Sequence, residues 1–409
     1  MEDSVFERGY QLFQVQKFDA AIEYLQQALQ QDPDHYGAKS LLVSCYIEKE
    51  DFARANTLND SLLAIYPNDD ELFYKRAIIA AASDKEALSK QSIDEAIRLN
   101  PYYSGYFGFK AHLHLISKDY ALALGLANKG LELDPNDVFC LNIRAQALTK
   151  LNRTDEANDT IQNTLYQDPE GSFSHANVGW IALEQGNHKK ALNHFKESLH
   201  NDPTNAYAQE GMQEAIKAKN FVYRTYLKYA FWMANKSSKS QWGFIIGLFI
   251  VYRILAKVLA SSGNENLAYL VIVPYMLFVV GGWIMEPMSN MILRFHSYGK
   301  YLLSKNQKAS GTIFFILLVL GTIASVLYGI YDNTLILLIA IAFFATIIPA
   351  TRGILAESKW TRTISLVVVI YTLFMGFFGF LIVEDAFWIG ASVPLGVVVY
   401  TWISGFLED

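Results

Sequence analysis

The chain has 409 residues, of which 52% are hydrophobic and 18% charged, and its formal net charge is −6. This length allows two or three domains. Residues 1–235 hold 23 Lys and Arg against 32 Asp and Glu, whereas residues 236–409 hold 11 against 8. An acidic first half argues against a nucleic-acid surface, which needs clustered basic side chains, and the charge-poor second half has the composition of a membrane domain.

The first half repeats with a fixed period of 34 residues. A proline closes each period at Pro33, Pro67, Pro101, Pro135, Pro169 and Pro203. The residue twelve positions earlier is always small: Ala21, Ala55, Ser89, Ala123, Ala157 or Ala191. The residue 24 positions before each proline is Gly9, Val43, Ala77, Ala111, Ala145 or Gly179, and Val43 is the only one of these six that is not small. A proline cannot continue a helix, so the pattern predicts helix pairs that each end near their proline and stack on their neighbours.

This pattern resembles the tetratricopeptide repeat family over residues 1–203. The resemblance implies an all-α superhelix of twelve antiparallel helices, in which the first helix of each pair lines the concave wall. Lys39, Asn59 and His175 stand where the other repeats have apolar residues. We therefore expect the second repeat to be the least regular.

The family's inner-wall positions, carried onto this sequence, define a candidate partner-binding groove. The residues at these positions are Phe6, Tyr10, Tyr74, Ile78, Phe109, His112, Asn142, Gln146, Asn177 and Trp180, while the second repeat offers only Ser40, Leu41 and Ser44. Lys75 is the only Lys or Arg at an inner-wall position, so a clamp for a carboxylate is not expected. We expect the groove to bind an apolar or aromatic-bearing peptide or helix, whose backbone would be hydrogen-bonded by Asn142, Gln146 and Asn177. The aromatic side chains have equal reason to pack between neighbouring helices.

Residues 204–239 are expected to cap the repeats and to lie at a membrane surface. The stretch 221–233 is rich in Tyr, Phe and Trp, and Lys217, Arg224 and Lys228 fall near one face of a helix. This combination is typical of the membrane–water boundary. The alternative is a plain cap that packs on the sixth repeat.

Residues 240–409 predict six transmembrane helices. Five stretches contain no Asp, Glu, Lys or Arg, and a helix needs about 20 such residues to cross a bilayer. A span is expected around each of these stretches, at about 266–286, 310–331, 333–350, 362–383 and 386–407. A sixth, at 241–260, is interrupted by Arg253 and Lys257.

Loop charges decide in favour of the sixth span. Two loops are basic, with Arg294, Lys300, Lys305 and Lys308 in one and Arg352, Lys359 and Arg362 in the other. The alternate loops hold only Glu265, Asp332, Glu384 and Asp385. Because basic loops stay in the cytoplasm, six spans place both termini there. Cytoplasmic termini agree with an N-terminus that carries no export signal. The predicted topology suits a bacterial inner membrane best.

Few residues suggest chemistry. Arg253 and Lys257 lie within the predicted span 241–260 and share a helix face. A charge inside the membrane indicates a functional site. The alternative is that both side chains extend to the membrane surface and only anchor the helix. The chain has no zinc-protease, serine-hydrolase or phosphate-loop motif. Cys45 and Cys140 lie in different repeats and predict reduced thiols, so we predict no catalytic, metal or cofactor site.

The sequence thus indicates a membrane-anchored adaptor that binds a protein or peptide partner in its cytoplasmic groove. Its interactions would be with that partner and with membrane lipid. The alternative is a transporter, channel or membrane enzyme with regulatory repeats. A polar, water-filled cavity around Arg253 would favour that alternative, and a tightly packed helix bundle would favour the adaptor.

Overall fold

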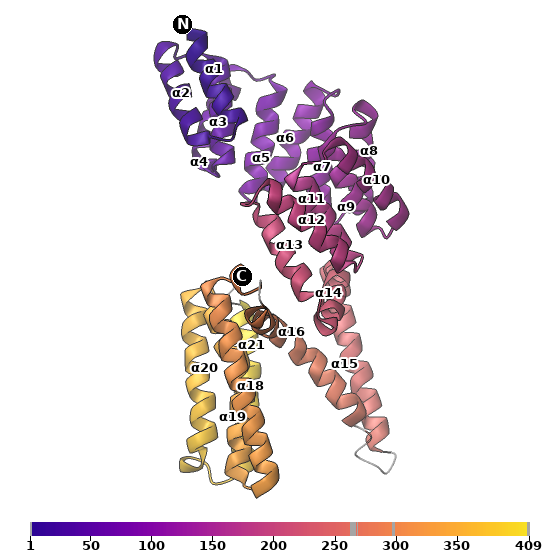
Figure 1. The fold of residues 1–409 in the computed structure, drawn as a ribbon, viewed down its shortest axis with the longest axis vertical. Coiled ribbons are helices and arrows are strands. Elements are labelled where there is room, and N and C mark those ends of the chain that lie inside the picture. Colours follow the sequence, from indigo (N-terminus) through magenta and orange to yellow (C-terminus); the bar gives the residue numbers. More distant parts are fainter. Residues whose placement is uncertain (1, 262–266, 268, 297–298, 407–409) are drawn as a thin grey trace. The chain divides into compact units, whose positions relative to one another are not determined.

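Figure 1 shows the computed structural model, which describes residues 2–261, 267, 269–296 and 299–406. Within these ranges the regular structure is helical and contains no strand. The chain divides into two compact units, residues 1–181 with 200–202 and residues 182–199 with 203–409. The division falls inside the sixth repeat, earlier along the chain than the expected boundary at residue 203.

Six helix pairs follow the predicted period. The first helices are α1 (Glu2–Gln14), α3 (Tyr36–Glu48), α5 (Asp70–Ala82), α7 (Ser104–Ile116), α9 (Val138–Lys150) and α11 (Ser172–Glu184). The second helices are α2 (Phe18–Gln31), α4 (Phe52–Ile65), α6 (Glu86–Leu99), α8 (Tyr120–Leu133), α10 (Thr154–Gln167) and α12 (His188–Asn201). From Phe18 and Tyr36 onward, both series begin every 34 residues.

Each pair turns at one residue with left-handed backbone geometry. These residues are Gln16, Glu50, Asp84, Lys118, Asn152 and Gly186, with φ between 55° and 81°. Five of the six carry a side chain, although this region of backbone conformation suits glycine best. The repeat geometry therefore outweighs the local preference at five turns.

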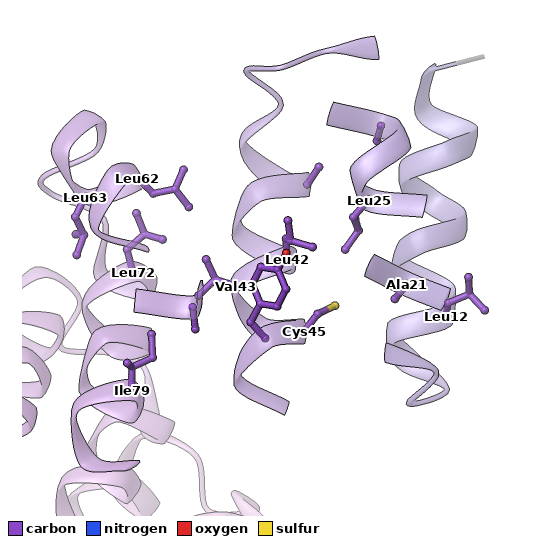
Figure 2. Packing of buried hydrophobic residues seen from close by; sticks show 14 residues of the cluster. Leu12, Ala21, Leu25, Leu42, Val43, Cys45, Leu62, Leu63, Leu72 and Ile79 are labelled. Atoms are coloured by element: carbon purple, nitrogen blue, oxygen red, sulfur yellow. The ribbon is translucent and has the colours of Figure 1, made fainter. Parts of the chain in front are cut away.

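Small residues let the two helices of a pair approach closely. Ala21, Ala55, Ala123, Ala157 and Ala191 are fully buried. Figure 2 shows the core of the first repeats: α3 directs Leu42 and Cys45 toward one neighbouring helix and Val43 toward the other. Close contact of this kind on both sides of a helix is typical of well-packed cores.

The second repeat is as regular in its helix lengths as the others. Its irregular residue, Asn59, is 1% exposed, and its side-chain Nδ2 donates a hydrogen bond to the Leu72 carbonyl at 3.1 Å. A buried amide is tolerated when it is hydrogen-bonded. That bond satisfies only the donor side of the amide, because the Asn59 Oδ1 is buried and makes no hydrogen bond to the described residues. The helices of the second repeat nevertheless keep the lengths of the others.

The segment after Pro203 forms a seventh helix pair rather than one continuous helix. Helix α13 (Ala206–Lys217) begins 34 residues after Ser172, in register with the repeats. Helix α14 (Phe221–Ala234) begins after Asn220, which caps it with a φ of −71°. The last turn therefore lacks the left-handed residue of the other six.

Six long helices make up most of the second unit: α15 (Ser238–Ala260), α16 (Tyr269–Phe295), α18 (Lys305–Tyr331), α19 (Thr334–Leu355), α20 (Lys359–Phe378) and α21 (Ala386–Phe406). The short helix α17 (Gly299–Leu302) and the 3₁₀ turn η2 (Gly379–Leu381) complete it. Among the described residues, six segments are long and apolar enough to cross a membrane, as many as predicted. Helix α16 continues beyond the expected end at 286, and its residues Ser289 and Asn290 are buried.

Helices α19, α20 and α21 pack closely through small and hydroxyl side chains. A Cβ added to Gly376 would lie 2.2 Å from the Ala342 Cβ, so the glycine is required at this crossing. The Thr346 and Thr372 hydroxyls lie 2.8 Å apart and share a buried hydrogen bond. Packing through small residues and interhelical hydrogen bonds is typical of membrane helices.

Candidate functional site

The first unit contains a groove with a volume of about 1030 Å³. Its walls come from α1, α3, α5 and α7, from the end of α4 and from the loops that precede α5 and α7. Its aromatic residues are Phe13, Tyr36, Tyr66, Tyr74, Tyr103 and Tyr106, and its charged residues are Glu48, Asp69, Asp70, Glu71 and Lys75. We call this surface the repeat groove.

The carboxylates at the start of α5 are held by neighbouring repeats. Asp69 caps α5 by accepting the Leu72 amide N–H at 3.1 Å, and it also accepts the Tyr36 hydroxyl from the preceding repeat. Asp70 accepts the Tyr106 hydroxyl at 2.7 Å and the Asn100 amide at 2.9 Å. These bonds fix two negative charges at the middle of the groove.

Asp70 remains ionised at neutral pH. Burial acts to raise its pKa, but the hydrogen bonds from Tyr106 and Asn100 outweigh burial and hold the pKa below its ordinary value. Burial and the neighbouring Asp70 raise the pKa of Tyr106 in turn. The tyrosine therefore stays a neutral donor and the aspartate a charged acceptor.

Lys75 is buried and its ammonium is fully hydrogen-bonded. Its Nζ donates to the Ser40 carbonyl at 2.9 Å and to the Ser40 hydroxyl at 2.6 Å, and it lies 2.7 Å from Glu71 Oε1. An ammonium has three donors, and these three acceptors use them all. Lys75 thus joins two repeats and does not offer its charge to a carboxylate ligand.

Aromatic rings run without interruption from the groove into the next repeats. Ring centroids lie 4.7 Å apart for Tyr103 and Tyr106, 5.1 Å for Tyr106 and Tyr74, and 5.4 Å for Tyr74 and Phe109. The series continues through His112 at 6.5 Å from Phe109. These spacings are typical of interacting aromatic pairs.

Only two of the ten inner-wall residues expected from the sequence, Tyr74 and Ile78, line the repeat groove. Phe6 lies against the His35 ring at 4.7 Å, and Tyr10 is 44% exposed on α1. Phe109 is 8% exposed and belongs to the core. For Phe109 the structure thus supports packing between helices, the alternative left open by the sequence.

The remaining expected residues lie in the later repeats. Asn142 and Asn177 are each 1% exposed and bond to one another, with 2.8 Å between Asn177 Nδ2 and Asn142 Oδ1. Their side chains link α9 to α11 rather than facing solvent. His112, Gln146 and Trp180 are half-buried, and burial lowers the pKa of His112.

The sequence prediction missed part of the groove for two reasons: the helix-end residues of the first helices, such as Glu48 and Asp70, lie outside the inner-wall positions, and the connections between repeats were not considered. Tyr66, Asp69, Asn100 and Tyr103 come from the connections between repeats. A usable signal was present, since aromatic and acidic residues gather around Pro67 and Pro101. Loops that follow a rigid scaffold often carry binding residues.

The intramembrane charges predicted from the sequence lie on the exposed side of α15. Arg253 and Lys257 are both exposed, and they line a depression of about 420 Å³ with Tyr252 and Ile272 among its other residues. No buried carboxylate appears among the residues that line it. This arrangement offers no proton relay.

Nothing in the described part of the chain resembles a metal centre, since no group of three or more His, Cys, Asp or Glu residues is suitably placed. Cys45 and Cys140 are both free and buried, as predicted. Burial raises the pKa of Cys45 to about 11. Such thiols are poor nucleophiles at neutral pH.

Two regions match models of the tetratricopeptide repeat, residues 12–79 and residues 144–206. Small glutamine-rich tetratricopeptide repeat-containing protein 2 of Mycosarcoma maydis is 25% identical over 96 residues, which are 24% of this chain and 27% of that protein. The DnaJ homolog subfamily C member 7 homolog of Dictyostelium discoideum is 23% identical over 227 residues, 51% of this chain and 42% of that protein. The chain therefore spans less than half the length of these relatives.

Among solved structures, a tetratricopeptide repeat protein from Parabacteroides merdae is 14% identical, with a TM-score of 0.42 over 58% of this chain and 94% of that one. The residues matched by the family models contain helix pairs with the 34-residue period described above. Residues 12–79 and 144–206 thus carry tetratricopeptide repeats.

Proposed function

We propose that the protein is a membrane-anchored adaptor whose repeat groove holds a segment of a partner protein beside the membrane. The observation that carries the proposal is the groove itself, a volume of about 1030 Å³ lined by residues of four successive repeats and their connections. Repeat solenoids commonly use such concave surfaces to bind extended ligands. The tetratricopeptide repeats of the first half support a protein or peptide as the ligand.

The groove exposes side chains that a partner could cover. Ile65 is 60% exposed, Tyr103 51% and Tyr66 40%. Burying such surface stabilises a complex by roughly 25 cal/mol per Å² of apolar area before the costs of association. Clustered exposed aromatic residues are typical of binding surfaces.

The long helices of the second unit support the membrane part of the proposal. Their outer faces expose large apolar side chains, among them Trp402 at 73%, Ile330 at 67% and Leu395 at 63%. Continuous apolar surfaces of this kind are unfavourable in water and are covered by lipid when a helix crosses a bilayer. If these helices cross a membrane, the basic loops favour a cytoplasmic location for the repeats.

The alternative of a transporter, channel or membrane enzyme has less support. It called for a polar cavity around Arg253, but that side chain lies on the exposed side of α15. The depression beside it is lined by six residues of α15 and α16. Six helices are more than an anchor needs, so the test below includes this alternative as an outcome.

Site-specific photocrosslinking tests the adaptor function. The photoreactive residue p-benzoylphenylalanine replaces Tyr66 in the groove or Tyr166, which is 81% exposed on α10 outside it. Irradiation of native membranes is expected to give a discrete adduct with a cellular protein at Tyr66 and none at Tyr166. Adding Tyr74→Ala should weaken that adduct, because it removes a ring from the groove floor.

An absence of adducts at both positions would contradict the adaptor function. Solute uptake into vesicles should then be compared between the natural chain and Arg253→Gln. A loss of uptake in that variant would support transport instead.

A further inference from the structure

We propose that the repeat groove selects a partner segment that carries a basic side chain, with arginine preferred over lysine. This inference rests on the proposed function and names the chemistry of the partner. It follows from the charge of the groove lining and from the rings that flank it.

The groove is strongly negative. Its lining contains four carboxylates, Glu48, Asp69, Asp70 and Glu71, and a single ammonium, that of Lys75. Only Glu71 lies in salt-bridge contact with that ammonium. Electrostatic complementarity between a negative groove and a positive segment favours both affinity and choice of partner.

Helix capping accounts for only part of this charge. Acidic residues at the start of a helix stabilise it, which explains Asp69 at the N-terminus of α5. Glu48 is the last residue of α3, where a carboxylate opposes the helix dipole. A negative charge kept at an unfavourable helix position fits a binding role better than a structural one.

Two exposed rings of the groove, Tyr103 and Tyr66, offer faces on which a guanidinium group can stack, while Tyr106 is buried behind Tyr103. Tyr74, Tyr103 and Tyr106 form one aromatic cluster beside Asp70, and Tyr36 and Tyr66 form another, with centroids 5.0 Å apart, beside Asp69. A guanidinium stacks on an aromatic face and donates paired hydrogen bonds to a carboxylate at the same time. An ammonium of lysine makes the charge contact without the planar stacking, which is the reason for the expected order.

Other occupants fit less well. A C-terminal carboxylate would be repelled by four like charges and would find the Lys75 donors already in use. A purely apolar segment would remove these carboxylates from water and add no positive charge to the hydrogen bonds that Asp69, Asp70 and Glu71 already make within the protein, which is unfavourable. A basic segment satisfies the charge and covers the rings.

Fluorescence anisotropy with the full-length protein in nanodiscs tests the inference. The lipid is uncharged overall, so that basic probes do not bind the membrane. The probes are labelled twelve-residue peptides with one fixed set of Leu, Tyr and Ser residues and three variable positions, occupied by arginine, lysine, citrulline or glutamate. We expect the arginine peptide to bind at least about tenfold more tightly than its uncharged citrulline isostere, with lysine between them and glutamate weakest.

Matched charge variants locate the binding. Glu48→Gln with Asp70→Asn removes two groove carboxylates and keeps an oxygen that can accept the Tyr106 and Asn100 bonds. Glu132→Gln with Asp159→Asn removes two exposed carboxylates outside the groove. The first pair should weaken the arginine peptide about tenfold and leave the citrulline peptide unchanged, while the second pair should change neither by more than about twofold.

Two results would overturn the inference. Equal weakening by both pairs of variants would mean that the acidic surface as a whole attracts the peptide. Equal binding of arginine and citrulline peptides, lost together in Tyr74→Ala, would leave the groove as a binding site but remove its charge selectivity. If the arginine peptide does not bind at all, the inference fails while a positive crosslink at Tyr66 would still support the adaptor function.

Discussion

Lys75 is a lysine in an unusual, buried environment. A lysine is almost never this deeply buried unless its charge is compensated, and Lys75 is 5% exposed. The compensation comes from Ser40 in the preceding repeat and from Glu71 one helical turn earlier. The position therefore acts as a polar link between two repeats.

Replacing Lys75 with methionine tests this link. Lys75→Met removes three bonds, two of them to the buried Ser40, so we expect it to lower the free energy of unfolding by about 1–3 kcal/mol. Lys110→Met is the control, because the Lys110–Asp94 ion pair is more exposed and should contribute less than about 1 kcal/mol. Urea denaturation in detergent, followed by circular dichroism, measures both. A Lys75→Met variant more stable than the natural chain would show that the free-energy cost of burying the ammonium exceeds the stabilisation from its hydrogen bonds and ion pair.

His112 makes the stability of the repeats depend on pH. Burial lowers its pKa from the ordinary 6.5, so the folded chain favours the neutral ring. The contribution of the neutral ring to the free energy of unfolding is complete above the pKa that His112 has in the unfolded chain. It is lost as the pH falls through the lower pKa of the folded chain. The urea concentration at the midpoint of unfolding should therefore decrease when the pH is lowered from 7.5 to 5.5, and it should decrease less in His112→Gln. The exposed His200→Gln should behave like the natural chain, and an unchanged pH dependence in His112→Gln would contradict the assignment.

Among the structural elements, the turn within each helix pair sets the geometry of the repeat. The left-handed residue recurs at every 34th position from Gln16 to Gly186, yet only the last is glycine. A side chain in this conformation costs roughly 1 kcal/mol or more. The turns are held by the packing of the two helices that they join.

One substitution made at two positions separates turn geometry from other effects. Glu50→Gly relieves a left-handed residue, whereas Glu23→Gly introduces glycine into the exposed interior of α2. The unfolded chain changes in the same way in both. We expect Glu23→Gly to lower the free energy of unfolding by about 1 kcal/mol and Glu50→Gly to leave it unchanged or raise it by up to about 1 kcal/mol. Equal losses in urea denaturation would show that the Glu50 backbone is not strained.

The sequence predicted these elements well because a proline and two small residues recur at fixed distances in each repeat. The groove was harder to predict, since neither the loop residue Tyr66 nor the helix-end residue Glu48 follows the periodic pattern. Burial of Asn142 and Asn177 was also invisible, because a period shows which residues share a helix face but not how tightly the next repeat covers them. The seventh pair was missed because it lacks the closing proline.

For the whole molecule, the distribution of charge between loops predicts how the chain crosses the membrane. The loop between α18 and α19 contains Asp332, and the loop between α19 and α20 contains Glu357. Six spans with cytoplasmic termini place these two loops on opposite sides. The natural thiols do not interfere with a labelling test, because Cys45 and Cys140 are buried.

Asp332→Cys and Glu357→Cys, made separately, test this topology with a maleimide reagent that cannot cross membranes. In intact cells the reagent should label Asp332→Cys, because its loop would face outside, and should label Glu357→Cys only after the membrane is opened. The natural chain should stay unlabelled in both conditions. The opposite pattern would place the repeats outside the cell, and labelling of both variants in intact cells would mean that α19 does not cross the bilayer. Either result would remove the membrane-anchored adaptor from consideration, since the groove could not then face a cytoplasmic partner.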